Sequence, residues 1–313
     1  MSDITVINDS EQSSLVTNGL AKNGELYLKA AGSTDAGAIV AYDSGVWRTF
    51  ANEASAGLSN TYSVDLDGSN DSINPVSDPG LSVYTMSFWM KTSQSSFAYI
   101  VGGFGGGTGA GDQREYAGIR INTTTGRLLE YQDFNGGGSN RIMAGDLVSG
   151  DLNDGAWHHI AIVYVPSGYT TTTGTASGNG EGYKIFLDGT RVDTTLVGSF
   201  DLPTTVPEFK VGREGARTLY YYNGLIDELA IFGSSLSDSQ ITNIYRGEDD
   251  VGSGGTNGVP GDLSTFDSNN GPTLWWRMGD TGSDYGTSTI TDAGSGGTNG
   301  TLANATFSTD VPT

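Results

Sequence analysis

Residues 222–245 read YNGLIDELAIFGSSLSDSQITNIY, and they carry the clearest structural signal in the chain. Residues 224–232 form a short apolar run that predicts a β-strand. Ser237 and Gln240 then have the spacing of a capping box. Ile241, Ile244 and Tyr245 share one apolar face before Gly247, so the second half predicts one short helix directly after the strand.

Other short strands are predicted on both sides of this segment. In residues 86–91, Met86, Phe88 and Met90 lie on one face of a strand, because side chains alternate between faces. Similar patterns occur at residues 62–66, 116–121, 127–131, 157–164, 183–187 and 209–212. Turns rich in Gly, Asn and Asp separate them. Many short strands joined in this way indicate an all-β sandwich or barrel.

The composition excludes several classes of protein. The chain has 313 residues, no cysteine and a net charge of −21, so it has no disulfide framework or thiolate metal site. Such an acidic surface repels nucleic acid and anionic lipid. No apolar run approaches the length of a membrane span, and the start, MSDITVIND, lacks the basic and apolar regions of a signal peptide. We therefore expect neither nucleic acid nor membrane insertion.

Five blocks of sequence together resemble a known family. They are YSVDLDGSNDSI (62–73), MSFWMKT (86–92), DGAWHHIAIVY (154–164), YKIFLDGTRV (183–192) and residues 222–245. Their order and spacing resemble the laminin-G-like jelly roll of the concanavalin A-like lectin/glucanase superfamily. The resemblance implies an antiparallel β-sandwich (jelly roll) over residues 57–250, acting as a binding or structural module.

The rest of the chain is predicted to form three smaller parts. Residues 1–56 predict a small β unit for docking, 251–272 a linker rich in Gly, Ser and Asp, and 273–313 a small β-rich C-terminal unit. The terminal units resemble parts of bacteriophage decoration and fibre proteins. We therefore expect their tryptophans to contact other subunits, and their removal to leave the sandwich folded; these residues are Trp47, Trp275 and Trp276.

A calcium site is one interpretation of the acidic turn after residue 62. Residues 65–71 are rich in oxygen ligands, although an EF-hand would need Glu where Val76 stands. The family resemblance implies a structural Ca²⁺ bound by Asp67, Asp71 and Asp227. The alternative is that these side chains cap turns through the backbone, as Asp commonly does.

Catalysis is not expected. His158 and His159 are adjacent on a strand, and so are Asp227 and Glu228, so each pair should point to opposite faces. Two carboxyls on opposite faces cannot flank one glycosidic bond. The carboxylate cluster of the glucanase relatives is also missing from this sequence. We predict that the protein is not an enzyme.

Aromatic residues are the candidate ligand contacts. Their rings could stack on sugars or pack on a partner protein. Alternation puts Tyr221 on the opposite face from its two neighbours. The candidate ligand contacts are Tyr131, Phe134, Tyr220, Tyr221 and Tyr222.

The glycine-rich stretch 102–112 lies between strands, which predicts a rim loop and not a phosphate loop.

Two functions remain open from the sequence. The first is a virion structural protein (a capsid decoration, collar or fibre component) that also attaches to host-surface glycans. Its partners would be other virion proteins in a homo-oligomer, on a particle surface, after synthesis in the host cytoplasm without a signal peptide. The alternative is a carbohydrate-binding module of a bacterial surface or secreted protein. Fold alone does not choose between them.

Overall fold

We analysed a computed structural model of the whole chain. It describes side chains at residues 58–74, 83–101, 119–121, 152–163, 184–192, 210–213, 220–252, 254–267, 270–282 and 284–313. Several further strands are described by their backbone. The chain divides into two compact units: Met1–Leu58 with Ser253–Gly255, and Ser59–Gly252 with Thr256–Thr313.

The first unit contains one four-stranded sheet. Its strands follow chain order: β1 (Thr5–Ile7), β2 (Leu26–Lys29), β3 (Ile39–Asp43) and β4 (Val46–Ala51). β1 pairs with β2 in parallel, and the other pairs are antiparallel. Trp47 lies in β4, but its side chain is outside the described residues.

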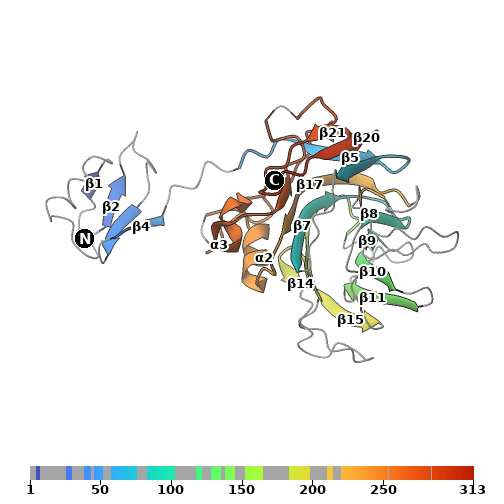
Figure 1. The fold of residues 1–313 in the computed structure, drawn as a ribbon, viewed down its shortest axis with the longest axis horizontal. Helices are drawn as coiled ribbons and strands as arrows, with labels where there is room; N and C mark the ends of the chain where they lie inside the picture. Colours follow the sequence, from blue (N-terminus) through green and yellow to red (C-terminus); the bar gives the residue numbers. More distant parts are fainter. Residues whose placement is uncertain are drawn as a thin grey trace. The chain divides into compact units, whose positions relative to one another are not determined.

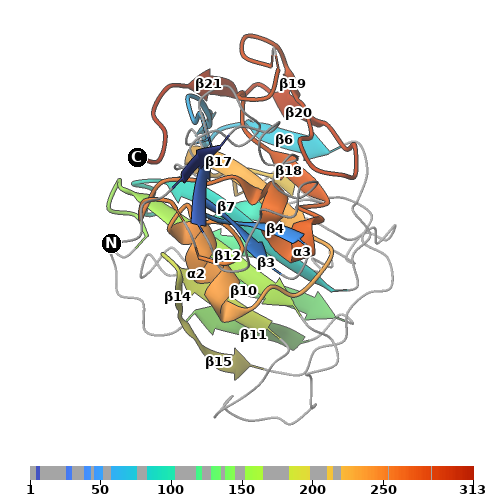
Figure 2. The same cartoon turned by 90° about the vertical axis from the view of Figure 1, so that its left-hand side faces the viewer.

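The second unit is an antiparallel β-sandwich, as predicted; Figure 1 shows its two layers, and Figure 2 shows the strands face-on. Sheet 1 has nine strands, in the order β15 (Asp193–Val197), β11 (Gly138–Ala144), β10 (Leu128–Phe134), β9 (Gly118–Ile121), β8 (Ala98–Gly102), β16 (Lys210–Val211), β6 (Ser72–Pro75), β20 (Gly300–Ala303) and β19 (Thr289–Ile290). Sheet 2 has the order β14 (Thr190–Arg191), β13 (Tyr183–Leu187), β12 (Trp157–Tyr164), β7 (Tyr84–Lys91), β17 (Asn223–Phe232), β5 (Ser63–Asp67) and β21 (Thr306–Ser308), and β18 (Leu274–Trp276) also pairs with β17.

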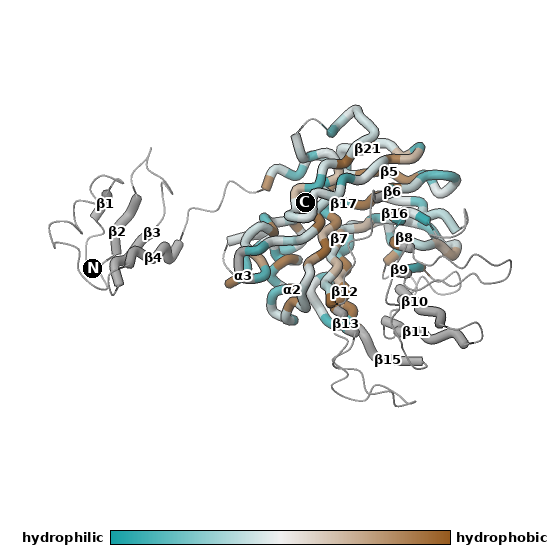
Figure 3. The backbone as a smooth tube through the Cα atoms, in the orientation of Figure 1, coloured by the Kyte–Doolittle hydropathy of each residue, from teal (hydrophilic) through white to brown (hydrophobic). Residues whose placement is uncertain are grey.

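The core lies between the inner faces of the two sheets. Met86, Phe88 and Met90 of β7 point into it, as their alternation predicted. Ile73, Ile100 and Val211 come from sheet 1. Figure 3 shows hydrophobic residues along β7, β12 and β17, which are the central strands of sheet 2.

The outer face of sheet 2 is also covered. Helix α2 (Asp238–Tyr245) begins at Ser237 with the predicted capping box, and in Figure 1 it lies on the side of β7 away from β8 and β9. Tyr245 stacks on Trp89 of β7, with ring centroids 5.9 Å apart. Trp89 belongs to the outward set of β7, so this face forms a second apolar layer.

The prediction that residues 251–272 form a linker is wrong for most of this range. Residues 256–270 pack on the same outer face and contain a 3₁₀ turn, η2 (Leu263–Thr265), and a short helix, α3 (Phe266–Asn269). Leu263 and Phe266 are buried, and the Phe266 ring lies 6.4 Å from that of Phe232. Leu263 and Phe266, with the buried Pro260, anchor the segment although Gly and Ser are frequent in it.

The prediction of a separate C-terminal unit at 273–313 is also wrong. β18 pairs with β17 and β21 pairs with β5 in sheet 2, whereas β20 pairs with β6 in sheet 1. Trp275 and Trp276 point to opposite faces, as predicted, but both are buried within the sandwich and not free for another subunit. Trp276 enters the core, where its Nε1 donates to the Thr298 carbonyl at 2.8 Å.

Within the described residues, none of the helices has the length and apolarity needed to cross a membrane.

A chain that ends at residue 272 should lose the cooperative unfolding of the sandwich. It lacks β18, β20 and β21 and the buried Trp276, whose truncation to Ala alone costs about 3–5 kcal/mol. Thermal unfolding followed by circular dichroism checks this. A chain that starts at residue 57 is the control and should keep the transition. An unchanged midpoint after removal of 273–313 would contradict the observed packing.

Candidate functional site

The predicted aromatic contacts separate into different environments. Tyr222 is fully buried in the core, and its hydroxyl donates to the Lys91 carbonyl at 3.1 Å. Burial raises the pKa of Tyr222 well above its usual range. Tyr220 is 45% exposed, and Tyr221 is half-buried. The side chains of Tyr131 and Phe134 on β10 lie outside the described residues.

Tyr220 belongs to a cluster that we name the sheet-1 aromatic cluster, formed by Phe97, Tyr99, Arg120 and Tyr220. The Phe97 ring meets the Tyr220 ring edge-on at 4.8 Å and the Tyr99 ring edge-on at 5.6 Å. Arg120 lies over the Phe97 ring, 4.8 Å from its centroid, and donates to the Tyr99 hydroxyl at 3.2 Å. A cation over aromatic faces is attracted by the ring quadrupoles, so the four side chains hold one another.

Strand alternation places this cluster outside the core. Ile119 and Ile121 of β9 point into the core, so Arg120 between them points away from it. Tyr99 is the direct cross-strand neighbour of Arg120. Tyr99 on β8 and Arg120 on β9 therefore point to the outer face of sheet 1, where both are buried, and the more exposed Phe97 and Tyr220 lie beside them.

The backbone holds Tyr220 in an uncommon conformation. Its φ is 56°, in the left-handed region where residues other than Gly are infrequent. The Tyr99 N–H donates to the Tyr220 carbonyl at 3.0 Å. The Gln94 side chain donates to the Tyr221 carbonyl and accepts from the Asn223 N–H, at 3.1 and 2.8 Å. These hydrogen bonds fix the backbone that carries the exposed Tyr220 ring.

The three predicted calcium ligands do not meet. Asp71 accepts from the Asp67 N–H at 2.7 Å, and Asp67 accepts from the Ser69 N–H at 2.7 Å, so both cap the turn. Asn223 pairs with Asp67, and Asp227 lies four residues further along β17, roughly 13 Å away. In the part of the chain with described side chains, no three acidic or histidine groups could hold an ion. The residues present do not fit the predicted site.

The two histidines have separate structural partners. His158 contacts Asp188 through Nδ1 at 2.9 Å and Asp154 through Nε2 at 3.2 Å. His159 is buried, and its Nε2 lies 2.8 Å from the Ser87 hydroxyl. Burial lowers the pKa of His159 to about 4, so it is neutral near pH 7. The pair does not converge on one point.

The expectation that Asp227 and Glu228 point to opposite faces is wrong. The register of β17 against β7 shifts between Asp227 and Ala230, and Glu228 has a φ of 47°. This β-bulge interrupts the alternation, because the additional residue is accommodated by a local bend. Both side chains thus reach the buried layer outside sheet 2.

Hydrogen bonds satisfy both buried carboxyls. Asp227 accepts from Asn60 Nδ2 at 2.9 Å and from the Glu228 N–H at 2.8 Å. Glu228 accepts from Trp275 Nε1 at 2.6 Å and from Arg277 Nε at 3.1 Å. Burial raises the pKa of Asp227 well above its usual range and that of Glu228 to about 7. Glu228 thus binds the C-terminal segment to the sheet, and Asp227 binds the segment before β5.

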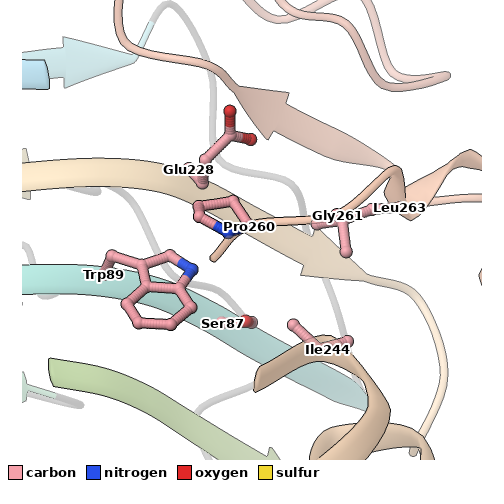
Figure 4. Close-up of a pocket in the computed structure, with 7 residues that line it drawn as sticks. All are labelled: Ser87, Trp89, Glu228, Ile244, Pro260, Gly261 and Leu263. Atoms are coloured by element: carbon pink, nitrogen blue, oxygen red, sulfur yellow. The ribbon is translucent and has the colours of Figure 1, made fainter. Parts of the chain in front are cut away.

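A small cavity lies beside this network (Figure 4). It holds about 10 Å³, room for roughly one water molecule. The lining comes from β7, β17, α2 and the 260–263 segment: Ser87, Trp89, Glu228, Ile244, Pro260, Gly261 and Leu263. The cavity is too small for a sugar, so a substrate cannot reach Glu228 or the Ser87–His159 pair through it.

The two antiparallel sheets define the fold as a β-sandwich of the jelly-roll type. Residues 67–242 match the model of the concanavalin A-like lectin/glucanases superfamily, in its laminin-G-type form. This match spans more than half of the chain, and the chain belongs to this superfamily.

Solved structures of similar fold come from several sources. A candidate carbohydrate binding protein from Bacteroides ovatus superposes with a TM-score of 0.51 at 19% identity, covering 93% of this chain and 71% of that chain. The CBM40 of the Ruminococcus gnavus IT-sialidase superposes with a TM-score of 0.44 at 15% identity, covering 59% of this chain and 98% of that chain. A SAP-like pentraxin from Limulus polyphemus superposes with a TM-score of 0.40 at 12% identity, covering 59% of this chain and 82% of that chain. A comparison with curated proteins gave no match.

The sequence analysis missed Phe97, Tyr99 and Arg120. Their signals were present, since Phe97 and Tyr99 are two residues apart and Arg120 stands between two isoleucines. Alternation alone puts each of them on an outward face. Their meeting with Tyr220 depends on the pairing of β8 with β9, which the individual strands do not specify.

Glu228 should make stability fall as the pH rises. Its pKa is raised from 4.5 to about 7 in the folded protein, so folding favours the protonated form, and the stability from this group is lost between these values. In Glu228→Gln this loss is absent. The free energy of unfolding of the variant minus that of the wild type should therefore increase by up to about 1.4 kcal/mol per pH unit over that range.

Urea unfolding at several pH values measures this difference. At low pH the protonated Glu228 carboxyl, like the amide of Gln, has one carbonyl acceptor, so the two proteins should differ least there. Asp65→Asn, which removes an exposed carboxylate, is the matched control and should follow the wild type. If the difference in unfolding free energy between Glu228→Gln and the wild type did not change with pH, the raised pKa of Glu228 would be refuted.

Proposed function

We propose that this protein is a non-enzymatic glycan-binding module and that Tyr220 of the sheet-1 aromatic cluster contacts the sugar. The observation that carries the proposal is the half-exposed Tyr220 ring, which is held by Phe97 and Tyr99 on the outer face of a lectin-type sheet. The lectin-type superfamily and the carbohydrate-binding description of the Bacteroides ovatus protein favour a sugar as ligand.

The chemistry of the cluster suits a sugar ring. A tyrosine offers an apolar face for the C–H face of a pyranose and a hydroxyl for its polar edge. The ring is already fixed, so binding orders few groups of the protein. With a net charge of −21, the protein should favour neutral glycans over polyanionic ones.

Binding without cleavage is favoured by the burial of the Asp227–Glu228 pair. Glycoside hydrolysis needs two carboxyls on either side of a bound glycosidic bond. Asp227 and Glu228 are 0% and 3% exposed and are hydrogen-bonded to other side chains. They support the fold in this arrangement.

The virion role inferred from the sequence stays a prediction. It includes the particle surface as location, other virion proteins as partners and a homo-oligomer. Trp275 and Trp276 no longer support it, because they are buried in the sandwich. Trp47 in β4 remains the residue to test for subunit contacts.

Tyr220→Asn should weaken glycan binding about tenfold or more. This variant removes the stacking ring, and Asn tolerates the left-handed backbone at this position better than most residues. A glycan array identifies the ligand, and calorimetry on the tightest-binding oligosaccharide measures the change in Kd.

Tyr220→Phe is the matched control, because it keeps the ring and removes only the hydroxyl. It should retain most of the affinity, and both variants should unfold at the temperature of the wild type. Equal affinity of Tyr220→Asn and the wild type would remove the cluster as the binding site. A wild-type protein that binds no glycan would refute the proposed function itself.

A further inference from the structure

A second exposed tyrosine lies in the C-terminal segment. Tyr285 is 54% exposed and lies between β18 and β19, outside residues 67–242 that match the family model. Its ring stacks on that of Tyr62, with centroids 4.1 Å apart and planes at 20°. The Phe307 ring of β21 lies 5.8 Å from it. One face of the Tyr285 ring is thus packed on Tyr62, and the exposure of the side chain indicates that the other face is open to solvent.

The turn that carries Tyr285 is held by its neighbour. Asp284 is buried, and its carboxylate accepts from the Thr291 N–H at 2.6 Å and from the Thr291 hydroxyl at 2.7 Å. The Asp284 carbonyl accepts from the Thr287 N–H at 2.9 Å and from its hydroxyl at 2.7 Å. Four hydrogen bonds to one residue fix the backbone directly before Tyr285.

Tyr62 and Phe307, which contact the Tyr285 ring, are themselves closely packed. Gly279 has a φ of 121°, and a Cβ there would come within 3.0 Å of Phe307 and of Tyr62. Asp280 accepts from the Thr61 and Tyr62 N–H groups at 2.9 and 3.2 Å. These contacts hold Tyr62 and Phe307 close to residues 279–280, so the surface on which Tyr285 stacks is preformed.

This arrangement repeats the construction of the sheet-1 aromatic cluster. Tyr220 and Tyr285 each rest on two further aromatic rings and expose about half of their surface. Among the residues with described side chains, Val251 is the only other exposed large hydrophobic residue. Among the described side chains, each tyrosine is thus the one exposed ring of its cluster.

A single exposed ring fits a sugar better than a protein partner. A stable protein interface buries about 800 Å² on each side around an apolar centre, which one tyrosine cannot provide. A single pyranose covers an area similar to one aromatic ring. The acidic surface again disfavours polyanions, so a neutral sugar suits this surface better than an acidic one.

We propose that Tyr285, stacked on Tyr62 beside Phe307, forms a second sugar-binding site for a neutral pyranose. The ligand class rests on the proposed function, but the location is independent of it. Two sites per chain allow a polysaccharide to be held at two points, which raises its apparent affinity without new contacts.

Calorimetry of the full chain tests this with neutral oligosaccharides of glucose, xylose, mannose and galactose. The wild type should bind the tightest of them with two sugars per chain, and Tyr285→Ser and Tyr220→Asn with one each. On an immobilised polysaccharide of the same sugar, Tyr285→Ser should bind about tenfold or more weakly. Tyr285→Phe keeps the ring and should resemble the wild type in both measurements.

The outcomes separate the two proposals. Unchanged stoichiometry and unchanged polysaccharide binding in Tyr285→Ser would overturn the second site and leave the proposed function intact. Loss of all binding in Tyr285→Ser with normal binding in Tyr220→Asn would support the Tyr285 site and overturn the sheet-1 cluster as the first. A wild type that binds none of the sugars would overturn both. Equal unfolding temperatures exclude misfolding as the cause.

Discussion

The burial of two adjacent carboxyls in the middle of sheet 2 is the constraint on which the rest of the structure depends. Asp227 and Glu228 lie in a layer of apolar side chains, where a carboxyl without hydrogen-bond partners would cost several kcal/mol. Their partners come from distant parts of the chain: Asn60 lies before β5, and Trp275 and Arg277 lie in and after β18. The C-terminal segment must therefore pack on β17.

That requirement explains the architecture beyond the family-matched region. Once β18 pairs with β17, the chain can return through β19 and β20 to sheet 1 and through β21 to β5. Asp310 then meets Lys91 at 2.6 Å and Trp157 Nε1 at 2.8 Å, which fixes the end of the chain against sheet 2. Both proposed sugar sites are supported by this frame, because the rigid rings rest on strands of the sandwich.

The sequence was sufficient for the parts of the fold that depend on local rules. Alternation in β7 predicted its inward methionines, and Ser237 and Gln240 predicted the start of α2. The bulge at Asp227–Glu228 was missed, because a regular alternation was assumed and a bulge has no local marker here. Tyr222 was misassigned as a ligand contact for a similar reason: its burial follows from long-range packing against the core.

The candidate site was only partly predictable. The Tyr220–Tyr222 run indicated an aromatic surface, but Phe97, Tyr99 and Arg120 join it through the pairing of β8 with β9. The C-terminal segment appeared separate because its strands are short and lie among Gly, Ser and Thr residues. Tertiary hydrogen bonds, which no local pattern reveals, placed it within the sandwich.

The most direct test of sugar binding at Tyr220 is a crystal structure of the full chain soaked with the neutral oligosaccharide that it binds most tightly. A sugar ring should lie stacked on Tyr220, next to Phe97. A sugar bound elsewhere on the sandwich, with the Tyr220 ring uncovered, would contradict it.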